Sequence, residues 1–72
     1  MRTEPIHIGD LVKLTRECMT VSGIRFNYGR VMIVQSCPGF GHPHYHLQTP
    51  DGRQGIGNLE RNDFELVEAS NG

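Results

Sequence analysis

The stretch HYHLQTPDGRQGIG, residues 44–57, carries the clearest structural pattern of the chain. Tyr45 and Leu47 alternate with polar residues, which is the period-2 pattern of a strand with one buried face. Thr49-Pro50-Asp51-Gly52 follows as a turn, because proline presets φ at the first central position and glycine accepts left-handed geometry. The stretch therefore predicts a β-hairpin with strands from His44 to Thr49 and from Arg53 to Gly57.

Strands are also predicted on both sides of this hairpin. Between Gly9 and Arg16, Val12 and Leu14 fall on one face of an alternating pattern. The run from Arg30 to Ser36 is apolar on both faces, which favours a central strand. A short 3₁₀ turn is predicted over 58–62, with Leu59 pointing inward, before a last strand that starts near Phe64. No window has the spacing of an amphipathic helix, so the sequence predicts an all-β fold of five strands.

The connection from Glu17 to Gly29 is long for a hairpin loop. It contains large apolar side chains that a solvated loop would not usually carry, among them Val21, Ile24, Phe26 and Tyr28. We therefore expect this segment to fold back onto the sheet.

Length and charge restrict the classes of function. A chain of 72 residues is a single small domain of marginal stability, for which we expect a flexible arm over 1–8, a packed domain over 9–67 and a disordered tail over 68–72. Seven basic and eight acidic residues give a weak long-range field, which argues against a constitutive nucleic-acid binder. Without a long apolar run, we expect a cytoplasmic protein that does not enter a membrane.

Several short motifs together resemble the SH3-like small β-barrels over about residues 8–67. They are a Gly-Asp opening before Val12 and Leu14, then Gly29-Arg30-Val31, the Pro-Asp-Gly hairpin, and a short turn leading into Asp63-Phe64-Glu65-Leu66-Val67. The group includes KOW-type domains of transcription and ribosomal proteins and the ferredoxin-docking subunit of photosystem I. The resemblance implies a compact scaffold whose loops dock onto a larger assembly. Because the chain has no Trp, the proline-rich peptide binding of eukaryotic SH3 domains is not carried over.

The leading functional hypothesis is therefore a non-enzymatic accessory or regulatory module that binds a protein partner without a cofactor. Arginine and aromatic residues are enriched at binding hot spots, and five of them lie in or beside the long connection or at the tip of the glycine-rich turn: Arg25, Phe26, Tyr28, Arg30 and Phe40. The alternative for Phe26 and Tyr28 is that they complete a small core. A second hypothesis is a KOW-like or phage-encoded transcription regulator that contacts RNA polymerase or nucleic acid, because the same residues could stack on bases.

A third hypothesis is a metal-binding domain. Potential ligands are concentrated at Cys37, His42, His44 and His46, and in an extended segment His44 and His46 would share a face. The alternation with Tyr45 and Leu47 equally predicts that these histidines are polar residues on a solvent-facing strand. No catalytic site is predicted, since a Cys-His pair also needs a pocket, an orienting group and an oxyanion site. Cys18 and Cys37 are interpreted as reduced thiols, with a disulfide between them as the alternative.

Overall fold

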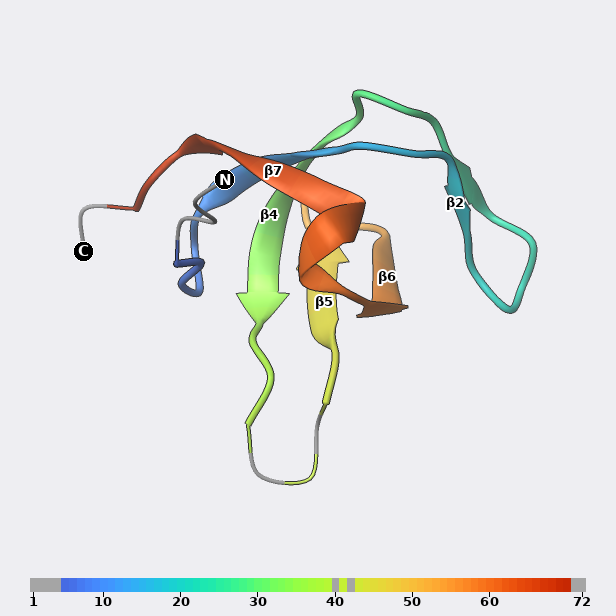
Figure 1. The fold of residues 1–72 in the computed structure, drawn as a ribbon. Helices are drawn as coiled ribbons and strands as arrows, with labels where there is room; N and C mark the ends of the chain where they lie inside the picture. The colour runs from blue at the N-terminus through green and yellow to red at the C-terminus, as the bar shows by residue number, and fades with distance from the viewer. Residues whose placement is uncertain (1–4, 40, 42, 71–72) are drawn as a thin grey trace.

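The computed structural model describes residues 5–39, 41 and 43–70. Its main sheet is antiparallel and has five strands, in the spatial order β6 (Gly55–Leu59), β5 (Tyr45–Gln48), β4 (Val31–Ser36), β1 (Leu11–Leu14) and β7 (Phe64–Glu68). Two shorter strands, β2 (Cys18–Met19) and β3 (Arg25–Phe26), pair only with each other. They form a hairpin that projects to one side of the main sheet (Figure 1).

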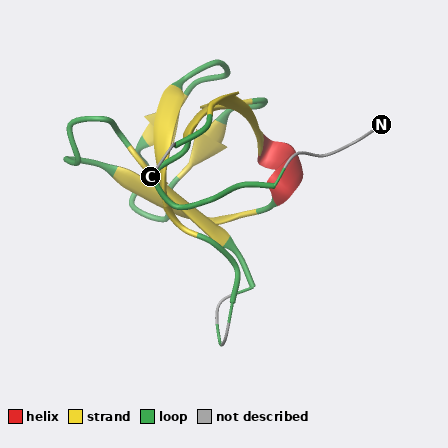
Figure 2. Ribbon diagram, turned by 90° about the vertical axis from the view of Figure 1, so that its left-hand side faces the viewer, coloured by secondary structure: helices red, strands yellow, loops and turns green. Residues whose placement is uncertain are grey.

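The predicted all-β fold is confirmed. The one helical element of the described residues is a single 3₁₀ turn, η1 (Arg61–Asp63), which precedes β7 (Figure 2). Within the same residues, β6 and β7 are the two edges of the main sheet and do not pair with each other, so the sheet is not closed into a barrel. The prediction that Leu59 lies in the 3₁₀ turn is wrong, because Leu59 pairs with Tyr45 and extends β6 beyond the predicted end at Gly57.

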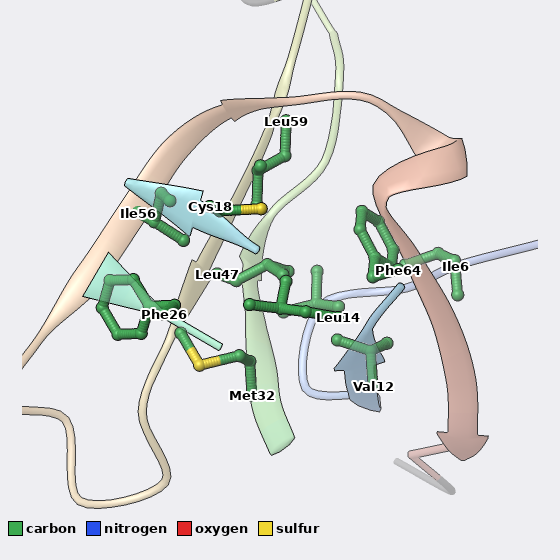
Figure 3. Packing of buried hydrophobic residues seen from close by; sticks show 11 residues of the cluster. Ile6, Val12, Leu14, Cys18, Phe26, Met32, Leu47, Ile56, Leu59 and Phe64 are labelled. Carbon is green, nitrogen blue, oxygen red and sulfur yellow. The ribbon is translucent and has the colours of Figure 1, made fainter. Parts of the chain in front are cut away.

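The core lies on one face of the main sheet, where alternate residues of β1 and β4 point inward. Val12 and Leu14 are buried as their spacing predicts, and so are Met32 and Val34 on β4. The opposite face of β4 is only partly covered, since Val31 is 38% exposed. Figure 3 shows this cluster, which consists of Ile6, Val12, Leu14, Cys18, Phe26, Met32, Val34, Leu47, Ile56, Leu59 and Phe64.

The β2–β3 hairpin contributes to this core, as the sequence predicts for the long connection. Cys18 and Phe26 are paired across the hairpin and both side chains are buried in the cluster. Burial of one large aromatic ring contributes about 1.5–3 kcal/mol relative to its exposure, so Phe26 alone is a substantial part of a core this small.

The segments next to the chain ends also pack on the sheet. Ile6 is buried in the core, within the segment that was expected to be a flexible arm. The buried Asp10 carboxylate accepts the backbone amides of His7 (2.8 Å) and Ser70 (2.7 Å), and therefore joins the two ends of the domain. Ordered packing thus extends beyond the predicted limits of 9 and 67.

Candidate functional site

The tip of the β2–β3 hairpin is an ordered loop that exposes apolar side chains. The Thr20 amide donates to the Ile24 carbonyl (2.9 Å), and the Ile24 amide donates to the Thr20 hydroxyl (3.0 Å). The turn is completed by Gly23, whose φ of 90° suits glycine. Val21 is fully exposed and Met19 is 54% exposed. Apolar side chains held in water on a hydrogen-bonded loop are typical of binding surfaces.

The base of the hairpin is fixed to the 3₁₀ turn. The Arg16 guanidinium contacts the Asp63 carboxylate at 2.7 Å, and the Thr15 hydroxyl donates to the Asn62 carbonyl at 2.7 Å. Asp63 also accepts the Glu60 amide (2.9 Å), within a capping box of η1. The hydrogen bond from Arg16 lowers the pKa of Asp63 despite the opposing effect of burial. These contacts set the direction in which the hairpin leaves the sheet.

An open groove of about 530 Å³ separates the hairpin from β6. One wall is the segment from Cys18 to Ser22, and the other is the whole of β6. Cys18, Ile56 and Leu59 belong to both the groove lining and the core, and Figure 3 labels all three within that cluster. The groove floor is therefore the apolar edge of the core. We call this feature, together with the exposed tip residues Met19 and Val21, the hairpin groove.

β6 contains a bulge that shapes its wall of the groove. Tyr45 pairs with Leu59 and Leu47 pairs with Ile56, so β6 has one residue more than β5 over this interval. Asn58 takes up the extra residue in the left-handed region, at φ 60°. Asparagine is one of the few residues besides glycine that adopts this conformation readily, and bulges of this kind bend a strand.

The predicted binding residues have different environments. Arg25 is exposed on β3, and its Nε lies 3.7 Å from a carboxylate oxygen of Glu17. Phe26 is fully buried, so the alternative of a core residue is correct for it. Tyr28 is 75% exposed, and the Arg30 guanidinium lies 5.9 Å from the centre of the Phe26 ring, which it covers. Phe40 lies outside the described residues.

The candidate metal ligands are only partly described, because His42 also lies outside that part of the chain. His44 is half-buried, His46 is exposed, and Cys37 is half-buried with its thiol 3.5 Å from the Ile6 carbonyl oxygen. Among the described residues, no three His, Cys, Asp or Glu side chains are grouped closely enough to hold a metal ion. Both cysteines are free thiols, and burial raises the pKa of each.

None of the residues that line the hairpin groove was among the predicted binding residues. The apolar content of residues 17–29 indicates a packed hairpin, and it already marks Val21 as unusual for a loop. Gly55 and Gly57 indicate a bend or a close backbone approach, but their sequence does not reveal that β6 is an edge strand. A pairing partner can be assigned only once the sheet order is known.

Comparison of the chain with protein-family models, with curated proteins and with solved structures gives no match. None of the described helical residues forms a segment that is long and apolar enough to cross a membrane.

Proposed function

We propose that this chain is a non-enzymatic protein-docking module, and that the hairpin groove is its docking surface. The observation that carries the proposal is the pair of exposed apolar side chains, Met19 and Val21, held by a hydrogen-bonded loop beside an open groove. Exposing apolar surface to water is unfavourable, and a partner that covers these side chains would recover that free energy. Interface cores are built from such apolar contacts, with a polar rim around them.

We further propose that the scaffold is related to the SH3-like barrels, with a main sheet that does not close. The order β6-β5-β4-β1-β7, the hairpin inserted between β1 and β4 and the 3₁₀ turn before β7 all resemble that architecture. In such a scaffold the loops carry function and the sheet holds them in place. This agrees with the position of the hairpin, whose base is fixed by Arg16 and Asp63 while its tip is exposed.

The charge distribution supports a protein partner in preference to nucleic acid. Three basic side chains are already close to carboxylates: Lys13 with Glu65, Arg16 with Asp63, and Arg25 with Glu17. With a formal net charge of −1, the chain has no excess of cations to neutralise phosphates. Arg30 is also positioned over a buried ring, where it shields the core.

The proposal is tested by affinity capture from the source cells with matched variants. Val21→Gln replaces a fully exposed apolar side chain with a polar one, and Ile8→Gln makes the same change at an apolar residue that is 66% exposed outside the groove. We expect the wild type and Ile8→Gln to retain a common protein partner, and Val21→Gln to lose it. The proposal is wrong if all three capture the same proteins equally, or if they capture nucleic acid with a steep salt dependence.

A further inference from the structure

We propose that the partner contributes an extended, uncharged segment that enters the hairpin groove as an additional β-strand between β2 and β6. This inference rests on the proposed function and specifies how the partner binds. An added strand would join the two-stranded and five-stranded sheets into one continuous sheet.

The β6 side of the groove offers unpaired backbone groups. The Thr49 amide donates to the Gln54 carbonyl (2.9 Å), so this pair is hydrogen-bonded across the turn. Hydrogen-bonded and non-hydrogen-bonded pairs alternate along antiparallel strands. Leu47 and Ile56 are therefore the next hydrogen-bonded pair, whereas the amide and carbonyl groups of Gly55 point away from β5, toward the free edge.

The β2 side of the groove also offers unpaired backbone groups. The Thr20 amide donates to the Ile24 carbonyl, and Met19 is the adjacent residue, paired with Arg25. By the same alternation, the Met19 amide and carbonyl groups point away from β3. Among the described residues no backbone hydrogen bond joins β2 to β6, so two strand edges flank the groove without bonding each other. Unpaired edges of this kind select an extended backbone rather than a helix.

The groove lining determines the side chains that fit. Arg16 is the charged residue of the described lining, and its guanidinium is bonded to Asp63 at 2.7 Å. The groove therefore presents no uncompensated charge, and a charged side chain from the partner would lose its hydration without gaining a counter-ion. The floor is formed by Cys18, Ile56 and Leu59, which are apolar residues of the core. Alternate apolar side chains of an added strand would cover this floor and contact Met19 and Val21 at the rim.

The test uses amide hydrogen exchange of isotope-labelled protein, with and without a defined probe. The probe is a heptapeptide of alternating valine and threonine, blocked at both ends and carrying a polyethylene-glycol tail. We expect it to slow exchange of the Met19 and Gly55 amides by at least about tenfold, because each gains a hydrogen-bond partner. The Ile56 amide is paired with Leu47 in both states and serves as the internal control. A probe N-methylated at every residue should give no protection.

The outcomes separate this inference from the proposed function. Exchange is measured again on the complex with any partner that is captured through Val21. If that partner binds while the Met19 and Gly55 amides stay unprotected, strand addition is wrong and docking stands. Concentration-dependent protection without any probe would show that a second copy of the chain occupies the groove, and would overturn the inference. Absence of both a captured partner and probe binding would overturn both proposals.

Discussion

Phe26 and Tyr28 are two residues apart, yet one side chain is fully buried and the other is 75% exposed. Simple alternation would place both on one face. The reason is that β3 ends at Phe26 and the chain then turns, with the Arg30 amide donating to the Asn27 carbonyl (3.1 Å) and Gly29 at φ 82°. The turn directs Tyr28 into solvent and brings Arg30 over the Phe26 ring.

Alanine substitutions at these two aromatic residues should therefore have very different effects. Phe26→Ala removes a buried ring and should cost about 3–5 kcal/mol, enough to unfold a core of this size. Tyr28→Ala should change the unfolding free energy by no more than about 0.5 kcal/mol. Urea denaturation monitored by circular dichroism measures both. Equal destabilisation by the two substitutions would contradict the assigned burial.

His46 and Gly57 are a second pair of residues in which one restricts the other. They lie on adjacent strands, and a Cβ atom built on Gly57 would be 2.4 Å from the His46 ring. The imidazole therefore occupies the space that any other residue at position 57 would need. Gly57 does not have a positive φ, so its backbone conformation by itself would accept alanine.

A double-mutant cycle tests this pair. In the wild-type background, Gly57→Ala should lower the unfolding free energy because the His46 ring must move. In a His46→Ala background the same change should raise it by about 0.5–1 kcal/mol, since alanine loses less backbone entropy on folding than glycine. Thermal or urea unfolding of the four proteins gives the coupling energy. The same effect of Gly57→Ala in both backgrounds would show that the two residues do not interact.

At the scale of elements, β6 is an edge strand, and it contains a bulge in which Asn58 adopts φ 60°. Edge strands are liable to pair with other chains, and a bulge limits the length over which such pairing can extend. The regular part of β6, before the bulge, is the part in which Gly55 pairs with Gln48 and Ile56 pairs with Leu47.

Substitutions of Asn58 should reveal the strain of the bulge. Asn58→Gly should leave the unfolding free energy nearly unchanged, because glycine adopts the left-handed region freely. Asn58→Val should lower it by about 1–2 kcal/mol, since a β-branched side chain is disfavoured there. Chemical denaturation of the two variants measures the difference. If valine were tolerated as well as glycine, the bulge would not be located at Asn58.

At the scale of the whole molecule, two carboxylates join segments that are far apart in the sequence. Asp10 bonds to His7 and to Ser70, and Asp63 bonds to Arg16. Burial by itself raises the pKa of Asp10, but the amide hydrogen bonds from Ser70 and His7, together with the nearby His7 side chain, lower it below its ordinary value of 3.8. The pKa of Asp63 is lowered chiefly by its hydrogen bond with Arg16. Both carboxylates are therefore more acidic in the folded chain than in the unfolded chain.

The folded protein should consequently lose stability in acid. A carboxylate with a lowered folded pKa contributes stability that is present above the unfolded pKa and is lost as pH falls through the folded pKa. The unfolding free energy should be nearly constant from about pH 7 to pH 5 and decline below about pH 4. Asp10→Asn should destabilise the protein at neutral pH and weaken this acid dependence, whereas Glu68→Gln, at an exposed residue, should do neither. Urea titrations at several pH values test this, and parallel curves for all three proteins would contradict it.

The sequence by itself determines the all-β class, the Pro-Asp-Gly turn and the inward-facing residues of the strands that alternate clearly. These features follow from local chemistry, namely the period-2 alternation of Val12 and Leu14 or of Tyr45 and Leu47, and the backbone preferences of proline and glycine. The sequence also indicates that residues 17–29 pack against the domain. The sequence does not predict that Phe26 is buried and Tyr28 is exposed, because the turn between them depends on where β3 ends.

Only the tertiary structure decides which strand edges are free and what faces them. The groove exists because residues 18–22 and 55–59, which are far apart in the chain, lie opposite each other. The contacts that fix this arrangement join Arg16 to Asp63 and Asp10 to Ser70, across 47 and 60 residues. No local pattern encodes such distant pairs, because their free energy is gained only after the intervening chain has folded and the entropy of closing the loop has been lost.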